Sequence, residues 1–191
     1  MLTKYLCDCI MPYTRKDKVP YAFLGHSMGT IQCIAITQAM ILRRARLPMG
    51  LFVVGRGPPH VVDPDPSMSN LSDDEMQAQF LKMGSPIGEM PTDDEFTQKV
   101  YATTRADSKI CDDLLDAKPQ VPMPLYCYQC KDEKGDVDEA LCRRWVELCR
   151  DEDDFVFHQV SGDHMACVIE PDHELKAKFK GDIEALLEYV S

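Results

Sequence analysis

Residues 21–30 read YAFLGHSMGT, a short apolar run, then the pattern Gly25-x-Ser27-x-Gly29, then the start of a long helical pattern. In this strand–turn–helix order the pattern is a nucleophile elbow, in which a serine lies on a sharp turn with a strained backbone. We expect a side chain at either flanking glycine to clash with the strand or the helix. The turn lifts the serine hydroxyl above the sheet, and the N–H groups of the first helical turn face a developing oxyanion. The stretch predicts that Ser27 is a catalytic nucleophile and not part of an ordinary tight turn.

The composition indicates a single globular domain and argues against nucleic-acid and membrane partners. The chain has 191 residues, and its net charge of −11 leaves no surplus of Lys and Arg to neutralise nucleic-acid phosphates. Its apolar runs are all far shorter than the ~20 residues that a membrane span needs, and its N-terminus lacks the pattern of a secretory signal. We therefore expect no nucleic-acid partner, no membrane partner, and a location in the cytoplasm or another reducing compartment.

The nine cysteines are spread through helical and strand patterns and do not cluster in loops. An odd number with this spread predicts reduced, mostly buried thiols. Cys127 and Cys130 form a C-x-x-C pair, but no second ligand pair follows at zinc-finger spacing, and neither His60 nor His158 has ligand-like spacing. We expect no metal site and no cofactor.

Hydrophobic periodicity predicts alternating helices and strands along most of the chain. The expected helices are 2–11, 30–46, 138–150 and 175–189, and the expected strands are 21–24, 51–55, 125–128 and 155–160. A continuous apolar run such as 51–54 is typical of a parallel strand buried on both faces. The alternation predicts an α/β fold with an open, mostly parallel sheet.

Residues from about 66 to 117 interrupt this alternation and are predicted to form a helical insertion within the same domain. Capping patterns predict short acidic helices that begin at Ser72, with Glu75 three residues on, and at Thr92, with Glu95 three residues on. Methionines recur along the insertion. They indicate either ordinary core filling or an adaptable lid over an apolar channel, and the sequence favours neither.

Four motifs together resemble the type II (external) thioesterases of polyketide, non-ribosomal peptide and fatty acid synthesis, which belong to the α/β-hydrolase superfamily. The motifs are VPYAFLGHSMG at 19–29, the strand and turn at 51–58, Arg105-Ala106-Asp107, and Gly162-Asp163-His164. Their order and spacing match from about residue 19 to the end of the chain. The resemblance implies an α/β-hydrolase-like fold with a helical lid. It also implies hydrolysis of acyl chains from an acyl carrier protein or from acyl-CoA, and a structural role for Asp107.

The resemblance also assigns roles at the site. It implies that Ser27 is the nucleophile, that His164 is the general base, and that the N–H of Met28 is a donor in the oxyanion hole. The residues themselves agree for His164, because it follows the last predicted strand on a glycine-containing loop at the carboxyl edge of the sheet. The order Ser…Asp…His along the chain is that of the α/β-hydrolases.

The acid of the triad is expected shortly after the strand that ends near Cys130. The local sequence does not align cleanly with the family there, so three carboxylates stay open. Asp132 is the first choice, Asp136 the second and Glu133 the third. The alternative is that the whole acidic loop is a solvated turn.

The chain departs from the family before the elbow. The family normally carries several strands and an oxyanion-hole loop there, whereas 26 residues precede Ser27 here. The sequence thus looks like a shortened member that lacks the N-terminal strands, which makes Tyr21–Leu24 an apolar sheet edge. We expect a homodimer, or pairing with another chain, through this edge.

Three functions are compatible with these residues. A missing oxyanion donor costs on the order of 10²–10³ in rate, so a weakly active or inactive homologue that binds a carrier protein or another partner is the alternative to a thioesterase. A general esterase or lipase would also satisfy the elbow. The intact Gly25, Ser27, Gly29 and His164 favour the enzyme.

Overall fold

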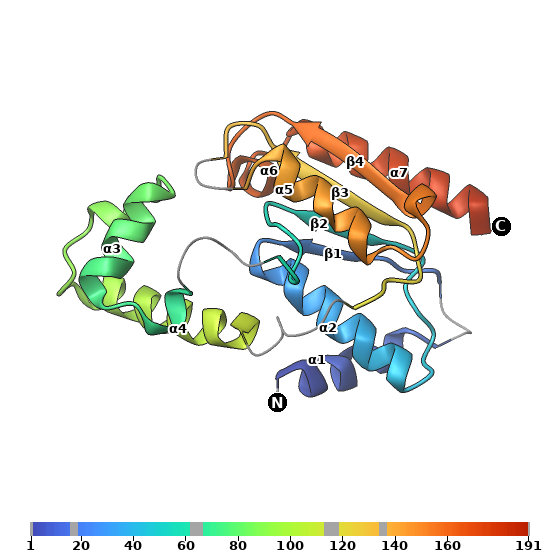
Figure 1. The fold of residues 1–191 in the computed structure, drawn as a ribbon, viewed down its shortest axis with the longest axis horizontal. Helices are drawn as coiled ribbons and strands as arrows, with labels where there is room; N and C mark the ends of the chain where they lie inside the picture. The colour runs from blue at the N-terminus through green and yellow to red at the C-terminus, as the bar shows by residue number, and fades with distance from the viewer. Residues whose placement is uncertain (1, 16–18, 62–66, 113–118, 134–136, 191) are drawn as a thin grey trace.

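The computed structural model describes residues 2–15, 19–61, 67–112, 119–133 and 137–190. Its centre is a four-stranded parallel sheet, shown in Figure 1. In spatial order the strands are β1 (Phe23–His26), β2 (Leu51–Val54), β3 (Leu125–Cys130) and β4 (Phe155–Val160). Because all four run the same way, their carboxyl ends meet at one edge of the sheet. The predicted mostly parallel α/β fold is confirmed.

Helices cover both faces of this sheet (Figure 1). They are α1 (Leu2–Ile10), α2 (Met28–Leu42), α5 (Glu139–Arg143), α6 (Ala166–Ile169) and α7 (Glu174–Val190). Since side chains alternate across a strand, Leu51 and Val53 pack with Trp145 on one face, whereas Phe52 packs with Leu186 of α7 on the other. α1 packs on α2.

The insertion stands to one side of the sheet, as Figure 1 shows. It contains α3 (Asp73–Lys82) and α4 (Glu95–Asp112), with short 3₁₀ turns at Met68–Asn70 and Pro86–Glu89. Ser72 and Glu75 form the predicted capping box of α3. Arg105 of α4 donates to the carbonyl of Leu71 at 2.9 Å and so ties α4 to the start of α3.

Two local expectations about helices are corrected, and one short helix was not expected. Asp94, and not Thr92, caps α4, since its carboxylate accepts from the Thr97 N–H at 3.0 Å; aspartate is the stronger cap. The helix predicted over 138–150 is α-helical only to Arg143 and then tightens into 3₁₀ geometry over Arg144–Leu148. There the buried Trp145 donates its indole N–H to the carbonyl of Arg56 at 2.8 Å. The short α6 has no counterpart among the expected helices.

No helix within the described ranges is both long enough and apolar enough to cross a membrane.

Candidate active site

Ser27 lies in a strained turn between β1 and α2. Its φ of 52° and ψ of −122° are a conformation that residues other than glycine rarely adopt. The Ser27 N–H donates to the carbonyl of Val54 at 2.8 Å, which fixes the turn to the end of the neighbouring strand. On its other side the Ser27 carbonyl accepts from the N–H and the hydroxyl of Thr30, at 3.0 and 2.7 Å. The serine is therefore held by both the sheet and the helix.

The two glycines of the elbow differ. A Cβ on Gly25 would lie 2.6 Å from the carbonyl oxygen of Gly29 and 2.6 Å from the Cα of Thr30, so the turn excludes every larger residue there. A Cβ on Gly29 would meet no described atom within 4 Å. The expectation that both glycines avoid a clash is thus wrong for Gly29, because this position faces open space at the start of α2.

His164 and Glu133 come together at the carboxyl edge of the sheet. Nδ1 of His164 contacts Oε1 of Glu133, and the two side chains are 23% and 4% exposed. An ionised carboxylate only accepts hydrogen bonds, and an imidazole that donates to it from Nδ1 keeps its lone pair on Nε2. The other carboxylate oxygen of Glu133 is buried without a hydrogen-bond partner among the described residues, so the contact with His164 is the side-chain interaction described for this carboxylate.

Asp132, the first choice for the acid, does not face His164. Its carboxylate accepts from the Gly162 N–H at 3.0 Å, and its own N–H donates to the Gly162 carbonyl at 3.1 Å. Asp132 therefore clamps the loop that carries His164. The chain then turns at Glu133, whose N–H donates to the Cys130 carbonyl at 3.3 Å, and the longer glutamate side chain reaches the imidazole. The second choice, Asp136, lies outside the described residues.

Asp163, beside the histidine, orients the loop. Its Oδ1 accepts from the N–H groups of Met165 and Ala166 at 3.0 and 2.9 Å, which caps the start of α6. Two residues that the sequence did not single out also hold His164. Nε2 of His26 lies 2.7 Å from the His164 carbonyl, and the two rings are 4.6 Å apart between centroids.

Gly55 is the second of these. It has a φ of 66°, and a Cβ built on it would lie 3.1 Å from Nδ1 of His164 and 3.6 Å from Oε2 of Glu133. The backbone of Gly55 thus forms the floor under the histidine–glutamate contact. A glycine directly after a buried strand is the one sequence signal that could have found it, whereas His26 occupies a variable position of the elbow pattern.

The position of Gly55 shows that His164 lies close to the turn that carries Ser27. It follows Val54, whose carbonyl accepts the Ser27 N–H, so His164 lies over the strand end that holds the elbow. Within the described part of the chain no hydrogen bond joins Ser27 Oγ to His164; such bonds are often formed only when substrate is bound. Met28 is the first residue of α2, where backbone N–H groups have no partner within the helix.

Nearly the whole chain matches a known family. A family model described as "Thioesterase domain" matches residues 1–179. Linear gramicidin dehydrogenase LgrE of Brevibacillus parabrevis is 26% identical over 174 residues, which are 86% of this chain and 62% of that protein. The chain therefore spans less than two thirds of the length of this curated relative.

Solved structures share the fold. Human thioesterase 2 superposes with a TM-score of 0.73 at 21% identity, over 100% of this chain and 82% of its own. YbtT, the type II thioesterase from the yersiniabactin pathway, superposes with a TM-score of 0.73 at 17% identity, over 100% of this chain and 74% of its own.

The geometry of the elbow predicts that a change from glycine to alanine affects the free energy of unfolding differently at Gly25 and at Gly29. Gly25→Ala should lower the free energy of unfolding by more than about 2 kcal/mol, because its methyl group meets backbone that cannot move aside. Gly29→Ala should leave that free energy unchanged or raise it by about 0.5–1 kcal/mol, because alanine is the better helix former. Chemical denaturation of the two variants measures both. Equal destabilisation would contradict the geometry of the turn.

Proposed function

Because this chain belongs to the thioesterase domain family, we propose that it is a serine hydrolase that cleaves acyl-thioesters through an acyl-enzyme on Ser27. The family supports thioester hydrolysis, and the observation that carries the proposal further is the contact between His164 and Glu133 beside the elbow. A histidine oriented by a carboxylate next to a serine on a strained turn is the arrangement that activates a hydroxyl group for attack.

In the proposed reaction Ser27 Oγ attacks the thioester carbonyl while Nε2 of His164 takes the hydroxyl proton. Glu133 keeps Nδ1 protonated and stabilises the imidazolium that forms. The N–H of Met28, at the start of α2, donates to the oxyanion. Collapse of the tetrahedral intermediate breaks the C–S bond, and the proton on His164 passes to the departing sulfur. Water activated by the same histidine then releases the acid and restores Ser27.

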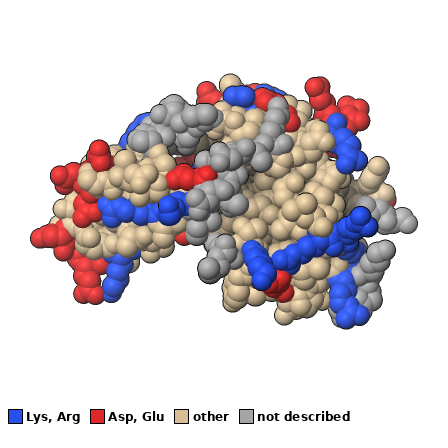
Figure 2. All heavy atoms as spheres, turned by 60° about the horizontal axis from the view of Figure 1, so that its bottom comes forward, with Lys and Arg blue, Asp and Glu red and all other residues tan. Residues whose placement is uncertain are grey.

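We propose an acyl group on the phosphopantetheine arm of an acyl carrier protein, or on coenzyme A, as the substrate. YbtT, which shares the fold, is described as a type II thioesterase from a non-ribosomal peptide and polyketide pathway. Carrier proteins are commonly acidic. Figure 2 shows a band of Lys and Arg across the core, while the outer end of the part formed by α3 and α4 is mostly acidic. Such a band is the face that an acidic carrier would approach.

The chain carries two clusters of basic residues that could take part in docking, at Arg43, Arg44 and Arg46 and at Lys176, Lys178 and Lys180. Both are partly engaged within the chain. Arg43 pairs with Asp8 at 2.6 Å, and Nζ of Lys176 donates to the carbonyls of Glu170 and Pro171 at 2.6 and 3.0 Å. Their contribution to carrier docking is therefore expected to be modest.

The proposal predicts that Ser27→Ala abolishes hydrolysis of acyl-thioesters, because the nucleophile is lost with little change in volume. Turnover of a short-chain acyl-CoA and of an acyl carrier protein bearing the same acyl group measures it, with circular dichroism to show that the variant is folded. If the alanine variant hydrolyses either substrate as fast as the parent, Ser27 is not the nucleophile. If the parent binds the carrier and hydrolyses neither substrate, the chain is a binding module.

The contacts of the acidic loop predict that Glu133 matters more than Asp132. Glu133→Gln removes the charge beside His164 and permits the wrong tautomer, so kcat should fall by about 10²–10⁴. Asp132→Asn keeps an oxygen that can accept from the Gly162 N–H, so kcat should change by less than about tenfold. The two variants are a matched pair, measured with the same thioester. A larger loss in Asp132→Asn would return the acid role to Asp132.

We further propose that the chain pairs with a second copy through β1. Within the described sheet β1 is an edge strand, bonded only to β2, and Leu24 on it is 49% exposed. Tyr21 and Phe23 pack toward the helices α1 and α2, but a helix cannot supply ladder hydrogen bonds to an open edge. Unpaired backbone groups beside an exposed leucine favour strand addition.

Sedimentation velocity at micromolar concentration tests this pairing. The parent should sediment as a dimer, and Leu24→Asp should shift it to a monomer. Leu81→Asp on α3, where the leucine is 52% exposed and far from the edge in sequence, is the matched control and should leave the dimer intact. A monomeric parent would refute the pairing.

A further inference from the structure

A cluster of two thiols and an imidazole lies beside the candidate active site, and its thiols play no part in the proposed hydrolysis. Cys130 ends β3, Cys167 lies on α6, and both belong to the buried cluster on the α7 face of the sheet. The two thiols interact with one another, and the Cys167 thiol also interacts with the ring of His26. Cys167 Sγ lies 3.5 Å from the carbonyl of His164.

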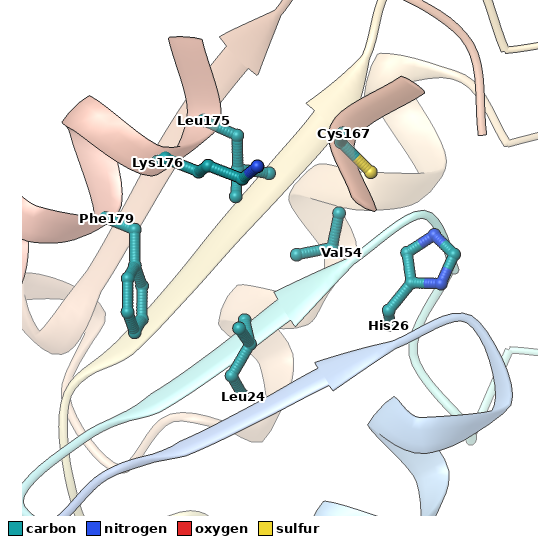
Figure 3. Close-up of a pocket in the computed structure, with 7 residues that line it drawn as sticks. All are labelled: Leu24, His26, Val54, Cys167, Leu175, Lys176 and Phe179. Atoms are coloured by element: carbon teal, nitrogen blue, oxygen red, sulfur yellow. The ribbon is translucent and has the colours of Figure 1, made fainter. Parts of the chain in front are cut away.

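This cluster opens into a cavity of about 300 Å³ between the edge of the sheet and α7. Figure 3 shows Leu24 of β1 and Val54 of β2 between the two ends of the cavity, with Phe179 of α7 at one end and His26 and Cys167 at the other. Cys167 is therefore a buried thiol that a small molecule can reach, whereas Cys130 is 0% exposed and does not line the cavity.

The surroundings of Cys167 favour its thiolate. Contact with the Cys130 thiol and then with His26 holds the pKa of Cys167 well below its usual range despite burial, whereas the same contact raises the pKa of Cys130. Burial by itself would lower the pKa of His26, but the Cys167 thiol and the His164 carbonyl outweigh it and raise that pKa. A thiolate beside an imidazolium is the form of cysteine that reacts with peroxides.

A second pair of cysteines supplies an internal comparison. Cys127 and Cys142 also interact, on the opposite face of the sheet, where they are 1% and 0% exposed within the core around Trp145. Burial raises the pKa of Cys127 well above its usual range. Cys127 and Cys130 form the C-x-x-C of the sequence, yet they point to opposite faces of β3 and so belong to different pairs.

We propose that Cys130 and Cys167 are a redox-active dithiol, a modification site that a hydroperoxide converts into a disulfide. The Cys167 thiolate attacks one oxygen of the hydroperoxide, the O–O bond breaks, and the departing oxygen takes a proton from His26. Cys167 is then a sulfenic acid. The sulfur of Cys130 then attacks the sulfur of this sulfenic acid and displaces the hydroxyl group. The hydroxyl group leaves as water after taking the proton of the Cys130 thiol. Two thiols have lost two electrons, and the peroxide has gained them.

The disulfide would join the two segments that hold the catalytic histidine and its carboxylate. Cys130 is three residues before Glu133, and Cys167 is three residues after His164. The Cys167 sulfur also lies 3.5 Å from the His164 carbonyl, so bonding it to Cys130 alters one of the contacts that place the histidine. This consequence rests on the proposed function, whereas the chemistry of the dithiol does not.

Peptide mapping after brief treatment with hydrogen peroxide tests the dithiol. The experiment uses the full chain carrying Cys9→Ser, which removes the exposed thiol. The expected product is a linked peptide pair containing Cys130 and Cys167, cleaved by dithiothreitol, while Cys127 and Cys142 stay alkylatable. In Cys130→Ala the sulfenic acid on Cys167 should persist and be trapped by dimedone, whereas Cys142→Ala should leave the linked pair unchanged.

Two results would overturn the dithiol: both cysteines remaining alkylatable under conditions that oxidise free cysteine, or linkage of Cys127 to Cys142 instead. Thioester turnover then tests the consequence for the site. It should fall by roughly tenfold or more on oxidation and return with dithiothreitol, since a small displacement of a catalytic group is costly. Equal turnover in both forms would refute the consequence. Absence of turnover in the reduced chain would count against the proposed function alone, and the peptide map would still decide the dithiol.

Discussion

The hydrogen bond from the Ser27 N–H to the Val54 carbonyl is the contact on which the candidate site depends. It extends the pairing of β1 with β2 by one residue, and it holds a backbone with φ of 52° that the serine would otherwise avoid. The conformation persists because Gly25 lets the start of α2 approach to a distance at which no Cβ fits. The hydroxyl group of Ser27 is thus placed at the carboxyl edge of the sheet by three features: the pairing of β1 with β2, the lack of a side chain at Gly25, and the start of α2.

The candidate base is placed by contacts from several separate segments. Glu133 orients the ring of His164, the backbone of Gly55 supports it, and His26 binds its carbonyl. Asp132 holds the same loop through Gly162. These groups follow β1, β2 and β3 or lie at their ends, so the sheet itself sets their spacing. A site built in this way costs little reorganisation during a reaction, since its groups are already in place.

The sequence predicted the features that depend on local pattern. The predicted strand over 155–160 matches β4 residue for residue, and α3 begins with the capping box that Ser72 and Glu75 predict. The fold class follows from the alternation of such segments and is confirmed, and the chain belongs to the thioesterase domain family.

Long-range contacts could not be predicted in this way. Asp132 and Glu133 are adjacent in the sequence, and the shape of the turn after β3 decides which of them contacts His164. The residue types alone do not predict that shape. The contact of His26 with His164 joins residues 138 positions apart. The open space at Gly29 depends on what surrounds the start of α2, and the pairing of Cys130 with Cys167 depends on where α6 packs. Each of these requires the tertiary structure.

The central claim is that Ser27 is a nucleophile activated by His164. Incubation with a serine-directed fluorophosphonate, followed by intact mass and peptide mapping, measures it most directly, because the reagent needs an activated hydroxyl group and no particular acyl chain. We expect one adduct per chain, on the peptide that contains Ser27, and a large fall in its rate of formation in His164→Ala. No adduct, an adduct on another serine, or an unchanged rate in the His164 variant would contradict it.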